Sequence, residues 1–157
     1  MRYCFDTSGF IQPWRYIYPP DLFSPLWQKI EELIKRGEIG SSEIVLDDLK
    51  RIEDEVFRWA KTQNNLFAKL DGPIQREVRE ILNVYPRLVE QGGRRSASDP
   101  FVVALAKINN ACVITYELFH PNSARVNIPF VCRHYNIRCK DLLGMMRDYS
   151  WRFNFVD

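Results

Sequence analysis

Ala111-Cys112-Val113-Ile114-Thr115 is the stretch of the sequence that decides the fold class. It is a short apolar run with β-branched residues, which is typical of a buried strand. The preceding residues 98–107 predict a helix, because Ser98 is a good N-cap, Pro100 stands near its start, and apolar residues follow at helical spacing. A helix that leads into a short buried strand indicates an α/β protein with a parallel sheet.

The same alternation of short strands and helices extends over the rest of the chain. Further strands or extended pieces are predicted at residues 2–5, 38–40 and 137–139. Further helices are predicted at residues 24–36, from Ser41 or Ser42 to as far as Trp59, from Pro73 to Pro86, and at residues 128–134 and 140–148. We expect a single domain over residues 1–157, a three-layer α/β/α sandwich with a central, mainly parallel sheet of about four to five short strands.

Composition limits the class of protein. The chain has 157 residues, of which 46% are hydrophobic and 27% charged, and this balance excludes a disordered or fibrous chain. Its net charge of +2 is too small to indicate a nucleic-acid partner by itself. Residues 1–20 lack the apolar run of a signal peptide, and no stretch is long enough to span a membrane. We therefore expect a cytoplasmic protein with no membrane partner.

The cysteine pattern argues against a zinc site. The four cysteines form no CxxC pair, and only two histidines accompany them. Cys4 and Cys112 lie inside apolar runs, where cysteine acts as a small buried hydrophobic residue. These features favour a reduced protein without disulfides.

Several acidic residues are predicted at one edge of the sheet. Asp6 directly follows the first strand, Glu117 lies just beyond the last buried strand, and Asp99 stands in the first turn of the helix before that strand. Asp47 and Asp48 lie in the helix that follows the second extended piece. Carboxylates that converge at one edge repel one another unless a cation lies among them, and hard oxygen ligands favour Mg²⁺ or Mn²⁺. In open parallel sheets this edge is where ligands bind.

Each acid also has a simpler interpretation. Asp99 at a helix start would interact favourably with the helix dipole, and Asp6 before a turn would be ordinary turn chemistry. Asp47 and Asp48 would belong to a solvated helix face. The joint placement of the acids at one edge is what favours a functional site.

Five segments, in order along nearly the whole chain, carry a recognisable pattern. They are YCFDTSGFI at 3–11, SSEIVLDDL at 41–49, SDPFVVALAK at 98–107, VITYE at 113–117 and NIPFVC at 127–132. Together they resemble the PIN-domain ribonucleases, in the subgroup of small toxins of prokaryotic toxin–antitoxin pairs. The resemblance implies a PIN-like fold and metal-dependent endoribonuclease activity.

The resemblance also implies a set of metal ligands. Its four acids would hold one or two Mg²⁺ or Mn²⁺ ions and thereby serve catalysis; they are Asp6, Asp48, Asp99 and Glu117. The family usually has glutamate where this chain has Asp48, so Asp47 or Glu43 remains an alternative ligand. We favour Asp48, because Asp47 would point about 100° away around the helix.

Residues around these acids have implied supporting roles. Hydroxyls of Thr7, Ser8 and Thr115 would orient carboxylates or water, or would simply bond to the turn and strand ends. Candidate phosphate contacts are Arg94 and Arg95, in a glycine-rich loop before Asp99, and Arg15, which follows Asp6. The neighbouring aromatic residues would either stack on RNA bases or pack against a partner protein; they are Trp14, Tyr16 and Tyr18.

The expected partners follow from the same resemblance. They are an RNA substrate, a cognate antitoxin protein and, as in many such toxins, a second copy of the chain in a homodimer. The alternative function is a PIN-like module that binds RNA or protein without turnover, an interpretation favoured by the aspartate at position 48. A phosphatase-like or receiver-like use of Asp6 is disfavoured, because no D-x-D follows the first strand.

Overall fold

The protein is a three-layer α/β/α sandwich, and this confirms the predicted fold class. The computed structural model describes residues 1–90, 97–121 and 126–154. Its central sheet has five strands in the order β3-β2-β1-β4-β5, and every pairing between neighbours is parallel. The strands are β1 (Tyr3–Phe5), β2 (Ile39–Ser42), β3 (Phe67–Ala68), β4 (Cys112–Ile114) and β5 (Cys139–Lys140).

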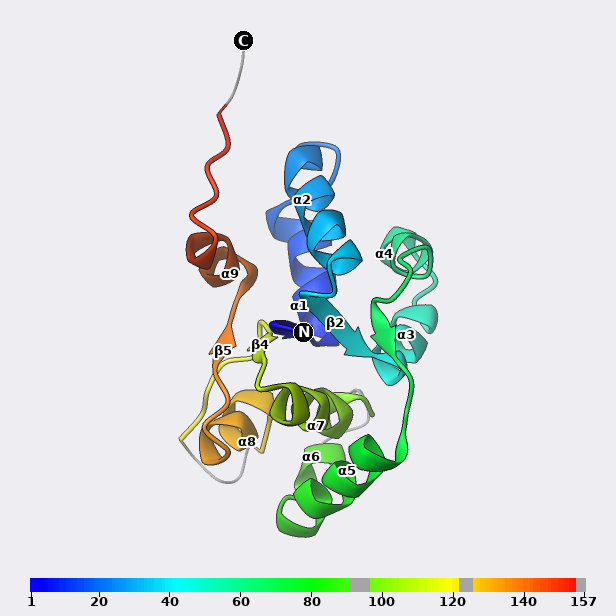
Figure 1. Ribbon diagram of the computed structural model, residues 1–157, viewed down its shortest axis with the longest axis vertical. Coiled ribbons are helices and arrows are strands. Elements are labelled where there is room, and N and C mark those ends of the chain that lie inside the picture. The colour runs from blue at the N-terminus through cyan, green and yellow to red at the C-terminus, as the bar shows by residue number, and fades with distance from the viewer. Residues whose placement is uncertain (91–96, 122–125, 155–157) are drawn as a thin grey trace.

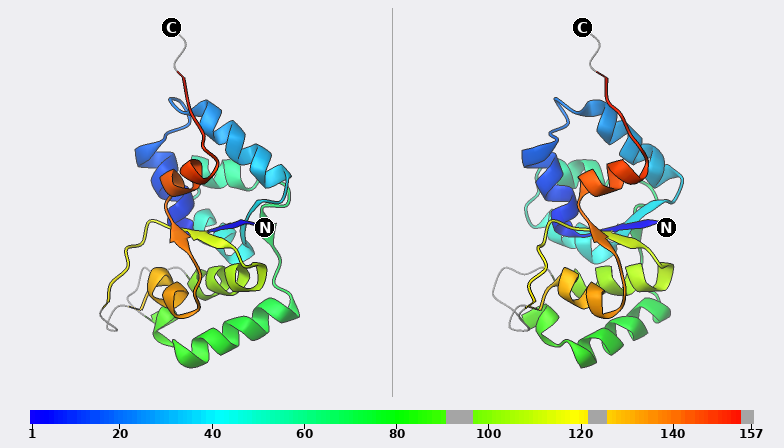
Figure 2. Two further views of the ribbon diagram at one scale, coloured as in Figure 1. Left: turned by 60° about the vertical axis from the view of Figure 1, so that its left-hand side comes forward. Right: turned by 90° about the vertical axis from the view of Figure 1, so that its left-hand side faces the viewer.

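Helices cover both faces of the sheet (Figure 1). In the described part of the chain they are α1 (Thr7–Gln12), the π-helix η1 (Pro13–Ile17), α2 (Ser24–Lys35), α3 (Glu43–Lys50), α4 (Glu55–Ala60), α5 (Gly72–Val84), α6 (Arg87–Glu90), α7 (Asp99–Asn109), α8 (Ile128–His134) and α9 (Leu142–Asp148). Figure 2 shows α1, α2 and α9 on one side of the sheet and α5, α6, α7 and α8 on the other. No helix of the described residues has the length and hydropathy needed to cross a membrane.

The core forms where β1 and β4 pass between the two helical layers. Cys4, Phe5, Val113 and Ile114 are fully buried, because helices pack on both faces of these central strands. The register aligns Phe5 with Ile114, so β1 and β4 end side by side.

Several local features differ from the predictions, and the helices η1 and α6 were not predicted at all. The residues after Asp6, expected to form a turn, form helix α1, and the Asp6 side chain caps it. The helix expected to run to Trp59 is divided into α3 and α4, because Glu53 adopts a left-handed conformation (φ 51°) and Asp54 caps a new helix. Strand β3 was not predicted, since two residues are too few to give a periodic pattern.

Most of the other boundaries shift by one to three residues, whereas those of α8 are as predicted. Strand β2 runs on to Ser42, where a shorter extended piece was expected, and β5 begins at Cys139. The last helix begins at Leu142, because Asp141 caps it by accepting a hydrogen bond from the Gly144 N–H.

Candidate functional site

The candidate site lies at the carboxyl edge, the edge of the sheet where the parallel strands end. Asp6 directly follows β1, and Thr115 directly follows β4, which pairs with β1. On the other side of β1, the Ser41 hydroxyl donates a 2.6 Å hydrogen bond to the Phe5 carbonyl, and Ser42 caps α3. The parallel register therefore brings residues from three distant parts of the sequence to one edge.

Asp6 is held in place by three hydrogen-bond donors. Its side chain is 3% exposed. It accepts a hydrogen bond from the Gly9 N–H at 2.5 Å and one from the Thr115 hydroxyl at 2.7 Å, and the Ser8 hydroxyl lies 2.9 Å from both carboxylate oxygens. The carboxylate is therefore fixed in orientation before any ligand binds.

Gly9 is required by this arrangement. A Cβ at position 9 would lie 2.5 Å from the Ile114 carbonyl oxygen and 3.1 Å from Asp6 Oδ1. Real side chains do not tolerate such a contact with backbone. The DTSG sequence thus lets the start of α1 approach the end of β4 closely enough for Thr115 to reach Asp6.

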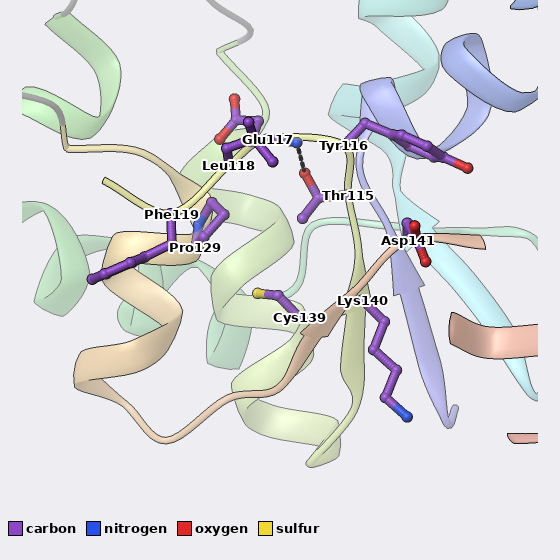
Figure 3. A pocket seen from close by; sticks show the side chains of 9 residues that line it. All are labelled: Thr115, Tyr116, Glu117, Leu118, Phe119, Pro129, Cys139, Lys140 and Asp141. Carbon is purple, nitrogen blue, oxygen red and sulfur yellow. Dashed lines mark hydrogen bonds between the residues drawn. The ribbon is translucent and has the colours of Figure 1, made fainter. Parts of the chain in front are cut away.

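The hydroxyls on Asp6 also bind the segment that follows β4. Ser8 Oγ accepts a hydrogen bond from the Tyr116 N–H at 2.9 Å, and Thr115 Oγ1 accepts one from the Glu117 N–H at 3.0 Å (Figure 3). Each hydroxyl thus donates to Asp6 and accepts from the backbone beside Glu117. This explains why Thr7-Ser8-Gly9 and Thr115 belong to one site, although more than 100 residues separate them.

The electrostatic environment of Asp6 disfavours its ionised form. Burial and, to a smaller extent, the negative charge of Glu117 raise the pKa of Asp6, whereas the hydrogen bonds from Thr115, Gly9 and Ser8 lower it. Together these effects give Asp6 a pKa of about 7. Glu117 itself accepts a 3.0 Å hydrogen bond from the Ile128 N–H at the start of α8. A cation at this edge would favour ionised Asp6.

Asp48 and Asp99 are also buried. Their exposed fractions are 6% and 5%. Thr7 Oγ1 lies 3.4 Å from Asp48 Oδ2 and 3.4 Å from the hydroxyl of Ser98, the residue before Asp99. Arg51 also reaches Asp48, with its Nη1 3.4 Å from Oδ1. Thr7 therefore links the start of α1 to the segments that carry both acids.

The structure distinguishes Asp48 from its two alternatives. Asp47 is exposed to solvent, as its helical spacing from Asp48 predicts. Glu43 accepts a 2.7 Å hydrogen bond from the Leu70 N–H and so fixes the chain beyond β3. Among these three acids, only Asp48 is buried and lies beside Thr7.

The donor chemistry fits a hard divalent cation, but the acids do not form a ready-made ligand set. All four predicted ligands offer carboxylate oxygens, the ligands that Mg²⁺ and Mn²⁺ prefer. Within residues 1–90, 97–121 and 126–154, however, no three His, Cys, Asp or Glu side chains are grouped closely enough to hold a metal ion. The metal-binding roles therefore stay predictions.

The candidate RNA-binding residues have different surroundings. Arg94 and Arg95 lie outside the described residues. Arg15 forms a salt bridge with Asp54, so its guanidinium is already paired with a carboxylate. Tyr16 is 69% exposed, whereas Trp14 packs against Trp27 and Trp59.

A cavity that the sequence analysis did not identify opens beside Glu117 (Figure 3). Its volume is about 320 Å³. It is lined by Thr115, Tyr116, Glu117, Leu118, Phe119, Pro129, Cys139, Lys140 and Asp141. These residues meet because β5 pairs with β4, with Ile114 opposite Lys140. No sequence pattern indicated the cavity, because the pairing of distant strands forms it.

Comparison with protein-family models identifies the family of the chain. The family model described as "Domain of unknown function (DUF4411)" matches residues 3–153. None of the curated proteins compared with the chain matches it.

Proposed function

The chain belongs to the DUF4411 family, and we propose that it is a divalent-metal-dependent endoribonuclease, the toxin of a type II toxin–antitoxin pair. One observation carries the proposal. Asp6 is a buried carboxylate fixed by three donors at the carboxyl edge, and its neighbour Thr7 and its partner Thr115 contact Asp48, the residue before Asp99 and the backbone of Glu117. The description of the family model, a domain of unknown function, argues neither for nor against the proposal.

The buried state of Asp6 supports a cation-binding role. Burial raises the pKa of Asp6 to about 7, because it disfavours the ionised carboxylate. A carboxylate that only caps α1 would cap it equally well when exposed to solvent. Ser8 and Thr115 nevertheless keep both carboxylate oxygens aligned rather than leaving the group free to rotate. Such a fixed, poorly solvated carboxylate is suited to a metal ligand, because the cation replaces the lost hydration.

Asp6, Asp48, Asp99 and Glu117 would hold one or two Mg²⁺ or Mn²⁺ ions. A bound ion supplies a more acidic water and stabilises negative charge on a phosphodiester. The residues of the chain then have distinct tasks: Ser8 and Thr115 orient Asp6, and Thr7 connects Asp48 to Ser98 beside Asp99. Neither histidine is needed in this scheme.

The alternative function is a PIN-like module that binds RNA or protein without cleavage. Two observations favour it: Asp48 is one methylene shorter than the glutamate of the PIN-domain pattern, and the described acids are not already grouped around a common point. Under this alternative, the network around Asp6 serves only to join α1 to the end of β4.

RNA cleavage decides between the two functions. Purified protein is incubated with total cellular RNA in Mg²⁺, in Mn²⁺ and in EDTA. We expect cleavage with either metal and none in EDTA, and a loss of orders of magnitude in Asp99→Asn, because one charged ligand is removed. Asp47→Asn is the matched control, since Asp47 is exposed, and it should cleave like wild type. Equal cleavage by wild type and Asp99→Asn, or none by either, would contradict the enzyme.

The toxin role is tested in cells. Expression of the wild-type chain in bacteria should slow growth, whereas Asp99→Asn should not. Co-expression of a neighbouring gene that encodes the antitoxin should restore growth. Normal growth with an RNA-cleaving wild-type protein would contradict the toxin role while leaving the nuclease in place.

A further inference from the structure

Two adjoining cavities extend away from Glu117 along the strand β5 side of the site. The first, of about 320 Å³, includes Glu117, and the second, of about 390 Å³, includes Arg133 and Arg138. Both are lined by Phe119, Pro129 and Cys139. We call the two together the Phe119 groove. Each cavity has a volume in the range that binds small ligands, about 300–1,000 Å³.

The middle of the Phe119 groove is apolar and carries an aromatic ring. Phe119 is 39% exposed although it is a large hydrophobic residue. The Phe130 ring lies nearly parallel to it, at an interplanar angle of 11°, and the Arg133 guanidinium lies 4.7 Å from its centroid. These contacts hold Phe119 in place, so it loses little conformational freedom when a flat ligand stacks against it.

The far end of the Phe119 groove is positively charged. Arg133 and Arg138 are both exposed, and neither forms a salt bridge with any residue that the structure describes. Lys140 differs, because its ammonium group lies 2.6 Å from both carboxylate oxygens of Asp148, and its side chain points away from Glu117 and Phe119 (Figure 3). The arginines are therefore the cations available to an anionic ligand.

We infer that the Phe119 groove binds the nucleotides of a single-stranded RNA next to the cleaved bond; this inference rests on the proposed function. A base would stack at Phe119, and the neighbouring phosphates would contact Arg133 and Arg138. The groove starts at Glu117, a proposed metal ligand, so a strand lying in it would pass the carboxyl edge. A duplex cannot present its bases in this way, because they are paired and stacked inside the helix.

RNA binding in EDTA tests the inference without depending on cleavage. The probe is a short fluorescent single-stranded RNA, compared with the same RNA annealed to its complement. Wild type should bind the single strand at least about tenfold more tightly than the duplex. Phe119→Ala should weaken single-strand binding about tenfold, and Phe119→Tyr should retain it, because tyrosine keeps the ring for stacking.

The arginines are tested by salt dependence. Arg138→Ala should reduce the slope of log affinity against log salt concentration by about 0.7, the value for one lost phosphate contact on a single strand. Arg36→Ala is the matched control, since Arg36 is an exposed arginine at the end of α2, just before β2 begins at the opposite edge of the sheet. It should leave the slope unchanged. Arg138 is exposed, so this variant tests the groove even if Phe119→Ala folds poorly.

Several results would overturn the inference. One is equal binding of the single strand and the duplex, and another is unchanged RNA affinity in both Phe119→Ala and Arg138→Ala. A third is displacement of the RNA by a polyglutamate peptide at a lower concentration than by unlabelled RNA. That result would indicate a protein-binding groove. Cleavage is measured separately in Mg²⁺. A protein that cleaves but shows no Phe119 effect on binding would refute the groove alone. A protein that binds through Phe119 but never cleaves would refute the nuclease alone.

Discussion

Thr115 Oγ1 donates a 2.7 Å hydrogen bond to Asp6 Oδ2 and thereby connects the ends of two paired parallel strands through a single side-chain contact. Thr115 Oγ1 also accepts a hydrogen bond from the Glu117 N–H at 3.0 Å. One hydroxyl thus fixes the orientation of one candidate ligand and the backbone of another. Loss of this hydroxyl should affect both.

We predict that Thr115→Val destabilises the protein by about 1–3 kcal/mol, because buried Asp6 loses one of its three donors and the Glu117 N–H loses its acceptor while the side-chain shape is kept. Thr62→Val is the control. Thr62 is exposed and donates to the Trp59 carbonyl, so its substitution should cost less than about 0.5 kcal/mol. Urea unfolding measures both. Equal effects of the two substitutions would show that the Thr115 contact adds nothing to stability.

Gly9→Ala should destabilise the protein by about 1–3 kcal/mol through overpacking. The new Cβ would meet the Ile114 carbonyl, which is part of the central sheet and cannot move aside. Gly72→Ala is the matched control in another helix, since its Cβ would meet only the end of the Arg76 side chain, at 3.3 Å. Thermal unfolding of both variants checks this prediction. A neutral Gly9→Ala would mean that α1 does not approach β4 so closely.

The stability of the metal-free protein should fall as the pH rises from about 4 to about 7. Asp in an unfolded chain titrates near pH 3.9, whereas burial raises the pKa of Asp6 to about 7 in the folded protein. Between these values the folded state binds more protons than the unfolded state, so raising the pH favours unfolding. The Asp6 contribution is at most about 4 kcal/mol.

Urea unfolding in EDTA across this pH range measures the effect. Asp6→Asn cannot titrate at this position, so its stability should depend less steeply on pH than that of wild type. Identical slopes in the two proteins would show that Asp6 is not the group responsible.

Sequence patterns predicted the central part of the fold because burial leaves a strong signal there. The apolar run at 111–115 became β4, and the helix predicted at residues 128–134 is α8 (Ile128–His134). The break between α3 and α4 was not predictable, because it depends on a left-handed Glu53, a residue type with no preference for that conformation. Strand β3 is defined by its pairing with β2, and its own two residues carry no strand pattern.

The candidate site was predictable where topology alone positions a residue. Asp6 and Thr115 each follow a central strand, and helical spacing distinguished buried Asp48 from exposed Asp47. The hydrogen bond from the Leu70 N–H to Glu43 and the salt bridge between Arg15 and Asp54 join residues 27 and 39 positions apart, and no local pattern encodes them. The cavity at Phe119 depends in the same way on the pairing of β4 with β5.

Divalent metal should stabilise the protein. Mn²⁺ or Mg²⁺ that binds only the folded state raises the melting temperature with concentration. The shift should shrink in Asp6→Asn and stay at the wild-type size in Asp47→Asn, whose side chain is exposed. Differential scanning fluorimetry over a series of metal concentrations measures it. A melting temperature that does not change with metal would argue against a shared site.

The most direct measurement is the anomalous scattering of Mn²⁺ in crystals of the protein. The account predicts one or two Mn²⁺ peaks at the carboxyl edge, with oxygens of Asp6 and of at least two of Asp48, Asp99 and Glu117 at about 2.0–2.5 Å from the ion. Binding would bring the acids closer together, because no three of the described ones are grouped closely enough to hold a metal ion in the structure. Mn²⁺ bound only elsewhere, with Asp6 still held solely by Gly9, Ser8 and Thr115 at saturating metal, would contradict the account.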